Sequence, residues 1–298
     1  MKVQPAQARA VIAVSIKSPS GIMTETFFSL LENRAQESSS LICVGLDPRS
    51  SDLPNISSAS YLDFCLNLIR QTAPYTAAFK LNPVYFETFR SEGWDMLRQV
   101  IDAVQKESIQ LSSMIPVILD SRYNDLGSIA NAYAEAAFDD LGAHCITLNP
   151  YLGKDSIEPF IRDQRKGAFL LCKTSNAGSM DIQNLLILPV GSDSPMPLYN
   201  YVAQLAQQWN ENNNVGIVVG AAHPQIMSNI RASAPDLWFL SSGVNPEGAE
   251  LESALKAGLR SDGSGMLIEL SPGNARTSQS PAEAVKNLRD KILKITDI

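Results

Sequence analysis

The 298-residue sequence predicts an α/β protein with a closed (β/α)8 barrel, the TIM barrel fold. Three observations predict it. Short apolar segments recur along the chain, stretches of helical periodicity lie between them, and polar residues follow many of the apolar segments. The apolar segments are continuously hydrophobic rather than alternating, as expected of parallel strands that are covered on both faces. Parallel strands that alternate with helices favour a barrel.

The apolar segments define eight expected strands. In chain order they cover residues 41–47, 77–82, 115–120, 144–149, 167–172, 215–220, 237–242 and 265–270. Each segment is followed by polar or small residues; the first, LICVGLD, already ends in Asp47. Eight is also the number of strands that closes a TIM barrel.

Amphipathic stretches between these segments are expected to form the covering helices. Clear examples are residues 61–71, 96–106 and 282–293, in which apolar side chains recur at helical spacing. An open, doubly wound sheet is the alternative architecture. Its dinucleotide-binding version has little support, because no GxGxxG motif follows the first expected strand.

The chain is expected to form a single barrel domain over residues 23–298, preceded by a poorly ordered extension at 1–22. The extension carries two lysines, one arginine and no acid, so a targeting segment is the alternative interpretation. The irregular stretch 191–198 is expected either to form a loop over the barrel mouth or to be a plain surface excursion.

Composition excludes several classes of function. The net charge is −7 with no basic block, which argues against a nucleic-acid partner. No apolar run approaches about 18 residues, so no membrane span is expected. The four cysteines are widely spaced and form no CxxC motif, which favours reduced core thiols and a reducing, cytoplasmic location. They are Cys43, Cys65, Cys145 and Cys172.

Charged residues gather where several expected strands end, which is where barrel enzymes place their chemistry. Asp120 and Arg122 are two residues apart in a strand and should share a side. Lys80, on the neighbouring strand, should reach Asp120. An ion-pair network that only closes the barrel is the alternative. The other polar strand-end residues are Asp47, Asn82, Asp125, Thr147, Asn149, Thr174, Ser175, Asn176, Ser241, Ser242, Glu269 and Ser271.

Six motifs occur in an order and spacing that resemble the orotidine-5'-phosphate decarboxylase family. They are GLDPR, FKLN, ILDSRYNDLGS, NPYLG, TSN and VVGA, and the resemblance covers roughly residues 26 to 295. It implies a carboxy-lyase that converts orotidine 5'-phosphate to UMP and CO2 without a cofactor or metal. It also implies a homodimer with a shared active site.

The resemblance assigns roles to individual residues. Lys80 and Asp120 match the first Lys and Asp of the family's alternating charge array, and Arg122 occupies its middle position. Asp125 matches an aspartate that the family contributes across the dimer interface to the partner's ribose. The expected substrate contacts are Asp47 at a ribose hydroxyl, Ser175 at the pyrimidine edge, and also Asn82, Glu247 and Arg276.

The sequence departs from the family pattern at the proton donor. The family has a lysine that donates a proton where this chain has Arg122. An arginine keeps its proton up to a pKa above about 12, so it can stabilise a carbanion but is a poor general acid. It can also hold a carboxylate through two hydrogen bonds. Lys80 or water would then supply the proton.

Further departures concern the expected phosphate end. Glu247 stands where the family has a glutamine, and Pro272 stands where it has a phosphate-gripping arginine, for which Arg276 is a possible substitute. Tyr123 and Asn124 replace the family's usual basic residue and glycine. Two alternatives follow: a divergent decarboxylase that acts on another carboxylate, with or without a phosphate, or a non-catalytic binding protein.

Metal and histidine chemistry have less support. His144 lies at the amino end of an expected strand and is expected in the core or at the barrel base. His223 is at a mouth position, where it either donates a hydrogen bond to a ligand or starts a helix. Two distant histidines make a zinc site unlikely. A magnesium site of Asp120, Asp125 and Glu269 is opposed by the neighbouring cationic side chains.

Overall fold

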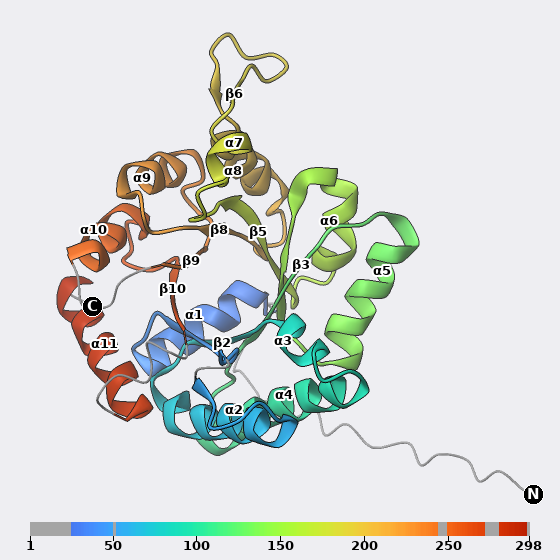
Figure 1. Cartoon of the computed structure of the whole chain (residues 1–298). Coiled ribbons are helices and arrows are strands. Elements are labelled where there is room, and N and C mark those ends of the chain that lie inside the picture. Colours follow the sequence, from blue (N-terminus) through green and yellow to red (C-terminus); the bar gives the residue numbers. More distant parts are fainter. Residues whose placement is uncertain (1–24, 50–51, 244–248, 272–279, 297–298) are drawn as a thin grey trace, which may run out of the picture.

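Eight parallel strands close into a barrel surrounded by helices, which confirms the predicted fold class (Figure 1). The computed structural model describes residues 25–49, 52–243, 249–271 and 280–296. The extension predicted for residues 1–22 lies outside the described residues. The strands follow the order β1-β10-β9-β8-β5-β4-β3-β2 around the barrel, so the last strand closes against the first.

Every predicted strand is present, and the apolar segments form the barrel wall. The strands are β1 (Ile42–Gly45), β2 (Ala78–Leu81), β3 (Val117–Tyr123), β4 (Cys145–Leu148), β5 (Gly167–Lys173), β8 (Val215–Val219), β9 (Phe239–Ser241) and β10 (Met266–Leu270). β1 and β2 are buried along their whole length, which explains why they show no alternation of apolar and polar residues.

The helices form the outer ring, and the predicted stretches 61–71, 96–106 and 282–293 lie within α2, α4 and α11. The helices are α1 (Phe27–Ser38), α2 (Ser58–Thr72), α3 (Pro83–Glu87), α4 (Ser91–Leu111), α5 (Gly127–Glu135), α6 (Lys154–Ile161), α7 (Ser179–Ile182), α8 (Leu198–Trp209), α9 (Pro224–Ser233), α10 (Ala249–Gly258) and α11 (Pro281–Thr296). Short helical turns cover Ala73–Tyr75, Ala136–Asp140 and Pro150–Leu152.

Helix α1 covers the amino end of the barrel, the base opposite the mouth. Phe28 stacks on Trp238 with ring centroids 6.0 Å apart, just before β9 begins. Phe27 packs so closely on Gly167, the first residue of β5, that a Cβ there would lie 2.2 Å from its ring. The base is therefore a packed plug that stabilises the barrel.

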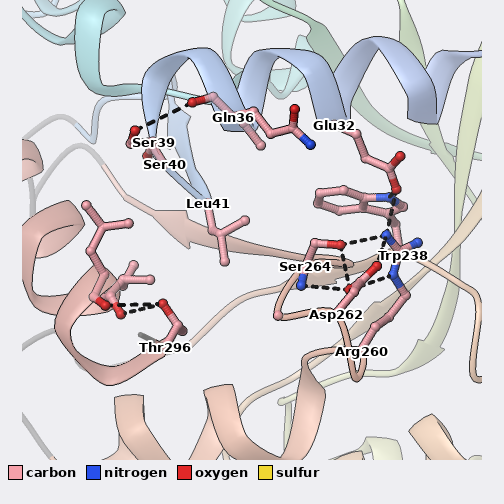
Figure 2. Close-up of a pocket in the computed structure, with 14 residues that line it drawn as sticks. Glu32, Gln36, Ser39, Ser40, Leu41, Trp238, Arg260, Asp262, Ser264 and Thr296 are labelled. Carbon is pink, nitrogen blue, oxygen red and sulfur yellow. Dashed lines mark hydrogen bonds and ion pairs between the residues drawn. The ribbon is translucent and has the colours of Figure 1, made fainter. Parts of the chain in front are cut away.

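A cavity of about 440 Å3 lies beside this plug, between α1, α11 and the loop before β10 (Figure 2). Its charged groups are already paired. Arg260 lies 2.6 Å from Glu32 and 3.2 Å from Asp262, and the indole of Trp238 donates to Glu32 at 3.2 Å. Because these groups satisfy one another, the cavity is a structural feature of the base, and the chemistry has to be sought at the other end.

The hairpin after α7 decides between the two interpretations of the irregular stretch. Residues 191–197 belong to the loop and second strand of a two-stranded hairpin formed by β6 (Leu186–Ile187) and β7 (Met196–Pro197), and Leu198 begins α8. Figure 1 shows that this hairpin extends outward beyond the ring of helices rather than over the barrel mouth. The interpretation as a surface excursion was therefore the right one. Leu186, Leu188 and Val190 are exposed on it.

The four cysteines are buried free thiols, as predicted. Cys65 donates to the backbone carbonyl of Leu46 at 3.3 Å, and Cys172 donates to that of Tyr199 at 3.1 Å. Burial raises the pKa of all four thiols, so none has the thiolate character of a reactive cysteine. Among the described helices, none is both long and apolar enough to cross a membrane.

His144 lies at the base, as predicted from its place before β4. Its Nδ1 accepts a hydrogen bond from the backbone N–H of Val117 at 3.1 Å, which requires a neutral ring at this atom. Burial, with the positive charge of Lys166, lowers the pKa of His144 from 6.5 to about 4. The ring is therefore a neutral structural acceptor at neutral pH.

This histidine should make the fold sensitive to mild acid. The unfolded chain binds the proton near pH 6.5 and the folded protein only near pH 4, so stability should fall as pH decreases between these values. We expect a loss of at most about 3 kcal/mol from this residue. Urea denaturation of wild type and His144→Asn, which keeps an acceptor but does not titrate, would measure it. An equal loss in both proteins would contradict the assignment.

Candidate active site

Lys80 is the buried centre of the barrel mouth. Its side chain is only 3% exposed, and its ammonium lies 2.8 Å from Asp120 Oδ2 and 3.2 Å from Glu269 Oε1. The contact between Lys80 and Asp120 confirms that the ends of β2 and β3 converge. Burial alone would lower the pKa of Lys80, but the charges of Glu269, Asp120 and Asp47 outweigh it and raise the pKa. Lys80 is therefore a fixed cation.

Asp120 is the most fully satisfied carboxylate of the mouth. Its Oδ2 accepts from Lys80, and its Oδ1 accepts from Thr147 Oγ1 at 2.7 Å and from Arg122 Nε at 3.3 Å. Burial alone would raise the pKa of Asp120, but Lys80, Arg122 and the Thr147 hydroxyl together lower it to about 2. The carboxylate is thus ionised over the whole physiological range, in one fixed orientation.

Arg122 extends from this carboxylate towards solvent. Its side chain is 58% exposed, so the contact with Asp120 uses only one edge of the guanidinium. Its two terminal nitrogens have no partner within the described residues. These nitrogens can bind a carboxylate through two hydrogen bonds. Asp120 and Arg122 do share a side, as predicted. They do so in an irregular part of β3, where Arg122 has a positive φ of 54°.

Asp47 approaches the array from the end of β1. Its pKa is raised, mainly by burial and further by Glu269 and Asp120, although Lys80 opposes the shift. Its Oδ1 is buried and has no hydrogen-bond partner within the described residues. A buried acceptor without a donor is unfavourable, so this atom is well suited to a hydroxyl of a bound ligand.

Asn82 and Ser175 lie at the mouth in different settings. The side-chain oxygen of Asn82 accepts from the backbone N–H of Val84 and caps α3, so this oxygen has a structural task. Ser175 is exposed after β5. A Cβ placed on Gly220, at the end of β8, would lie 3.1 Å from its Cβ, so Ser175 stands beside the next strand around the barrel.

Asp125 forms no ion pair with the charge array of its own chain within the described residues. Its Oδ1 accepts from the neighbouring backbone N–H of Leu126 at 2.8 Å. Glu247 and Arg276, the other two predicted contacts, lie outside the described residues. Their predicted roles therefore stay predictions.

Glu269 and Thr147 are polar strand-end residues that were not predicted to contact the array; Glu269 was considered only as a ligand of a magnesium site. The barrel order explains how they reach the site. β10 pairs with β1 and β1 pairs with β2, so Glu269 needs to cross only one strand to contact Lys80. β4 adjoins β3, which places Thr147 beside Asp120. The sequence signal that could have identified both residues is their position at the ends of strands that neighbour β2 and β3 in the closed ring.

The described residues offer no cluster of three carboxylate, cysteine or histidine side chains that could hold a metal ion. Asp120, Asp125 and Glu269 in particular are not gathered, because Lys80 occupies the space between Asp120 and Glu269. His223 is exposed at the start of α9 and makes no side-chain capping bond. This position favours the helix-start interpretation of His223.

Comparisons with known proteins support a common origin over most of the chain. Residues 40–265 match a family model described as "Orotidine 5'-phosphate decarboxylase / HUMPS family". The orotidine 5'-phosphate decarboxylase of Roseiflexus castenholzii is 35% identical over 276 residues, covering 89% of this chain and 97% of that protein. The enzyme of Herpetosiphon aurantiacus is 39% identical over 235 residues, covering 78% and 84%.

Solved structures agree with these sequences. The OMP decarboxylase of Leishmania donovani superimposes with a TM-score of 0.80 at 46% identity, covering 92% of this chain and 99% of that one. The UMP synthase of the same organism matches at 46% identity with a TM-score of 0.81, covering 92% of this chain and 57% of that longer one.

Removing the central cation should destabilise the fold in a pH-dependent manner. Lys80→Met would leave Asp120 and Glu269 partly or fully buried without their cation, and we expect a loss of about 3 kcal/mol at pH 7. The loss should shrink towards pH 5, because the two carboxylates can then take up protons. Urea denaturation at both pH values measures this.

Lys154→Met is the matched control, since Lys154 and Glu211 form an exposed ion pair at 2.9 Å. This variant should change stability little at either pH. A loss in Lys80→Met that grew towards pH 5, or that matched the control, would contradict the assignment of Lys80 as the compensating cation.

Proposed function

Because the chain belongs to the orotidine 5'-phosphate decarboxylase / HUMPS family, we propose that it converts orotidine 5'-phosphate to UMP and CO2 without a cofactor. Family membership also confirms the expected class of enzyme, a carbon–carbon lyase. The observation that carries the proposal is the contact of Lys80, Asp120 and Arg122 at the mouth of a chain aligned over most of its length with enzymes of that name.

The charges suit the loss of CO2 from a pyrimidine ring. The bond between ring carbon and carboxyl breaks, the electron pair stays on the ring, and Lys80 and Arg122 stabilise the resulting carbanion as fixed cations. The terminal nitrogens of Arg122, which have no partner among the described residues, could hold the departing carboxylate. Asp120, ionised and fixed, faces the same region. Kinetics on Asp120 variants measure how much the repulsion between Asp120 and the substrate carboxylate contributes to the rate.

The proton that replaces CO2 has to come from another group than Arg122, whose guanidinium holds its proton too firmly. The Lys80 ammonium has three N–H donors, of which the contacts with Asp120 and Glu269 use two. We assign the transfer to the third N–H or to water, and the raised pKa of Lys80 favours water. The ring carbon gains the proton, and a Lys80 amine formed in this way would be protonated again from solvent.

The remaining contacts follow the ligand's polar groups. We propose that Asp47 accepts a hydrogen bond from a ribose hydroxyl, which its buried and unpartnered Oδ1 supports. Ser175 would read the pyrimidine edge from its exposed position after β5. Asn82 would contribute through its side-chain nitrogen, because its oxygen caps α3. Glu247 and Arg276 remain predicted contacts at the phosphate end.

We further propose a homodimer in which Asp125 enters the partner's site. Within the described part of its own chain, Asp125 accepts a local hydrogen bond from Leu126 and forms no ion pair. Exposed apolar side chains lie on the segments that follow β2, β3 and β4, which are neighbouring strands of the barrel, and we propose that they contact the second copy. These side chains are Val84, Tyr85, Leu126, Ile129, Tyr151 and Leu152.

A second candidate function is favoured by the charge balance of the mouth. Within the described residues, the carboxylates of Asp47, Asp120 and Glu269 lie around Lys80 and Arg122, so this cluster of five side chains is negative when all are ionised. A substrate with a carboxylate and a phosphate adds further negative charge. A divergent decarboxylase acting on a carboxylate that lacks the phosphate would avoid this repulsion. A non-catalytic binding protein is the remaining alternative.

Turnover of orotidine 5'-phosphate tests the proposed reaction directly. Purified wild type mixed with orotidine 5'-phosphate should lower the absorbance of the substrate and produce UMP, and a chelator should leave the rate unchanged. Arg122→Lys should raise kcat, because lysine is the better acid. Asp120→Asn should lower kcat by about 100-fold or more. Mass spectrometry of the product checks the chemistry.

Other outcomes of this assay select between the alternatives. Activity in Arg122→Lys alone would indicate that the wild-type chain has lost the reaction. Silence in both proteins, together with a carboxylated metabolite that co-purifies and loses CO2 on incubation, would support the divergent decarboxylase. Silence with a ligand that remains intact would support a binding protein.

A second prediction concerns the shared site. Asp120→Asn and Asp125→Asn subunits should each be inactive alone, but mixing them should restore about a quarter of the wild-type rate. Half of the dimers would then be hybrids, and each hybrid would hold one complete site out of two. Size-exclusion chromatography confirms subunit exchange. No recovery in a mixture that has exchanged its subunits would show that Asp125 does not cross between them.

A further inference from the structure

Strand β3 leaves regular pairing where it enters the mouth. Leu119 pairs with Ile146, and the next pair along the strands is Tyr123 with Leu148. Between these two pairs, three residues of β3 therefore face one residue of β4. Within this irregular stretch Arg122 has a φ of 54°, a left-handed conformation that a residue with a side chain seldom adopts. Such a conformation persists only where surrounding groups hold it in place.

The single β4 residue opposite this stretch is Thr147. It is 1% exposed, and its hydroxyl makes two hydrogen bonds. The Oγ1 atom accepts the backbone N–H of Arg122 at 3.1 Å and lies 2.7 Å from Asp120 Oδ1. Since an N–H can only donate and an ionised carboxylate can only accept, the hydroxyl must donate its one proton to Asp120.

We propose that Thr147 is a positioning residue that couples the two charged members of β3. One hydroxyl fixes the orientation of the Asp120 carboxylate and, through the Arg122 N–H, the backbone turn that presents the guanidinium to the mouth. The inference rests on the proposed decarboxylation and goes beyond it, because Thr147 need not touch the substrate. It acts through Asp120 and Arg122.

Two substitutions at position 147 distinguish this role from ordinary core packing. The Thr147 methyl group could be supplied equally well by valine, which has the same shape. The hydroxyl could be supplied by serine, which lacks the methyl group. If packing matters, valine substitutes for threonine; if the two hydrogen bonds matter, serine does. The pair of variants therefore separates the two roles at one position.

The kinetic test compares wild type, Thr147→Val and Thr147→Ser with orotidine 5'-phosphate. We expect Thr147→Val to lower kcat by about 10- to 100-fold, because small displacements of reacting groups have effects of this size. Binding of the product UMP, measured by calorimetry, should change less than about threefold in both variants, because UMP lacks the carboxylate. Thr147→Ser should stay within about threefold of wild-type kcat.

Two kinetic results would overturn the proposal. One is a folded Thr147→Val that keeps kcat within about twofold of wild type. The other is a Thr147→Ser as impaired as Thr147→Val, which would assign the effect to the methyl group. Circular dichroism and thermal melting establish that each variant is folded before the rates are compared.

A readout without turnover separates this inference from the proposed function. The carboxyl carbon of Asp120 can be followed by NMR in protein labelled at aspartate, with the signal assigned by its loss in Asp120→Asn. Removing the Thr147 hydroxyl should raise the pKa of Asp120 in Thr147→Val and leave it near the wild-type value in Thr147→Ser. An unchanged pKa in Thr147→Val would overturn the proposal, whether or not wild type decarboxylates orotidine 5'-phosphate. Inactivity of wild type alone would count only against the proposed function.

Discussion

The ion pair between Lys80 and Asp120 is the interaction on which the rest of the mouth depends. The two charges are nearly excluded from water and lie 2.8 Å apart, so Lys80 is the main reason that Asp120 stays ionised, while Glu269 and Asp120 together keep Lys80 charged. Every other group at the site is arranged around this pair: Glu269 on the cation, Thr147 and Arg122 on the carboxylate. A preorganised charge array of this kind needs no rearrangement when a carbanion forms, which is the physical basis of the decarboxylation that we propose for it.

The base of the barrel is closed by packed and paired side chains, whereas the mouth gathers charged side chains. At the base, aromatic rings of α1 stack against Trp238 and charged groups such as Arg260 are satisfied by protein partners. At the mouth, the terminal nitrogens of Arg122 and the Oδ1 of Asp47 have no protein partner within the described residues. The cavity at the base, whose charged groups are paired, is therefore a poorer guide to function than the unpaired polar atoms at the mouth.

Much of the fold and part of the site could be predicted from the sequence. Continuous apolar segments predicted all barrel strands, because parallel strands are buried on both faces. Lys80 and Asp120 were predicted to meet because they end adjacent strands. The role of Glu269 was missed because its contact depends on ring closure, which joins residues far apart in the sequence. The irregular backbone at Arg122 was also missed, since arginine gives no signal for a left-handed conformation.

Ring closure also bears on how the protein is made. The strand that carries Glu269 is the last of the barrel and pairs with the first, so a growing polypeptide on the ribosome holds Lys80 and Asp120 long before their final neighbour has been synthesised. Until then the barrel has two open edges that expose unpaired backbone groups. Completion of the sheet and completion of the charge array thus coincide in one late event of biosynthesis.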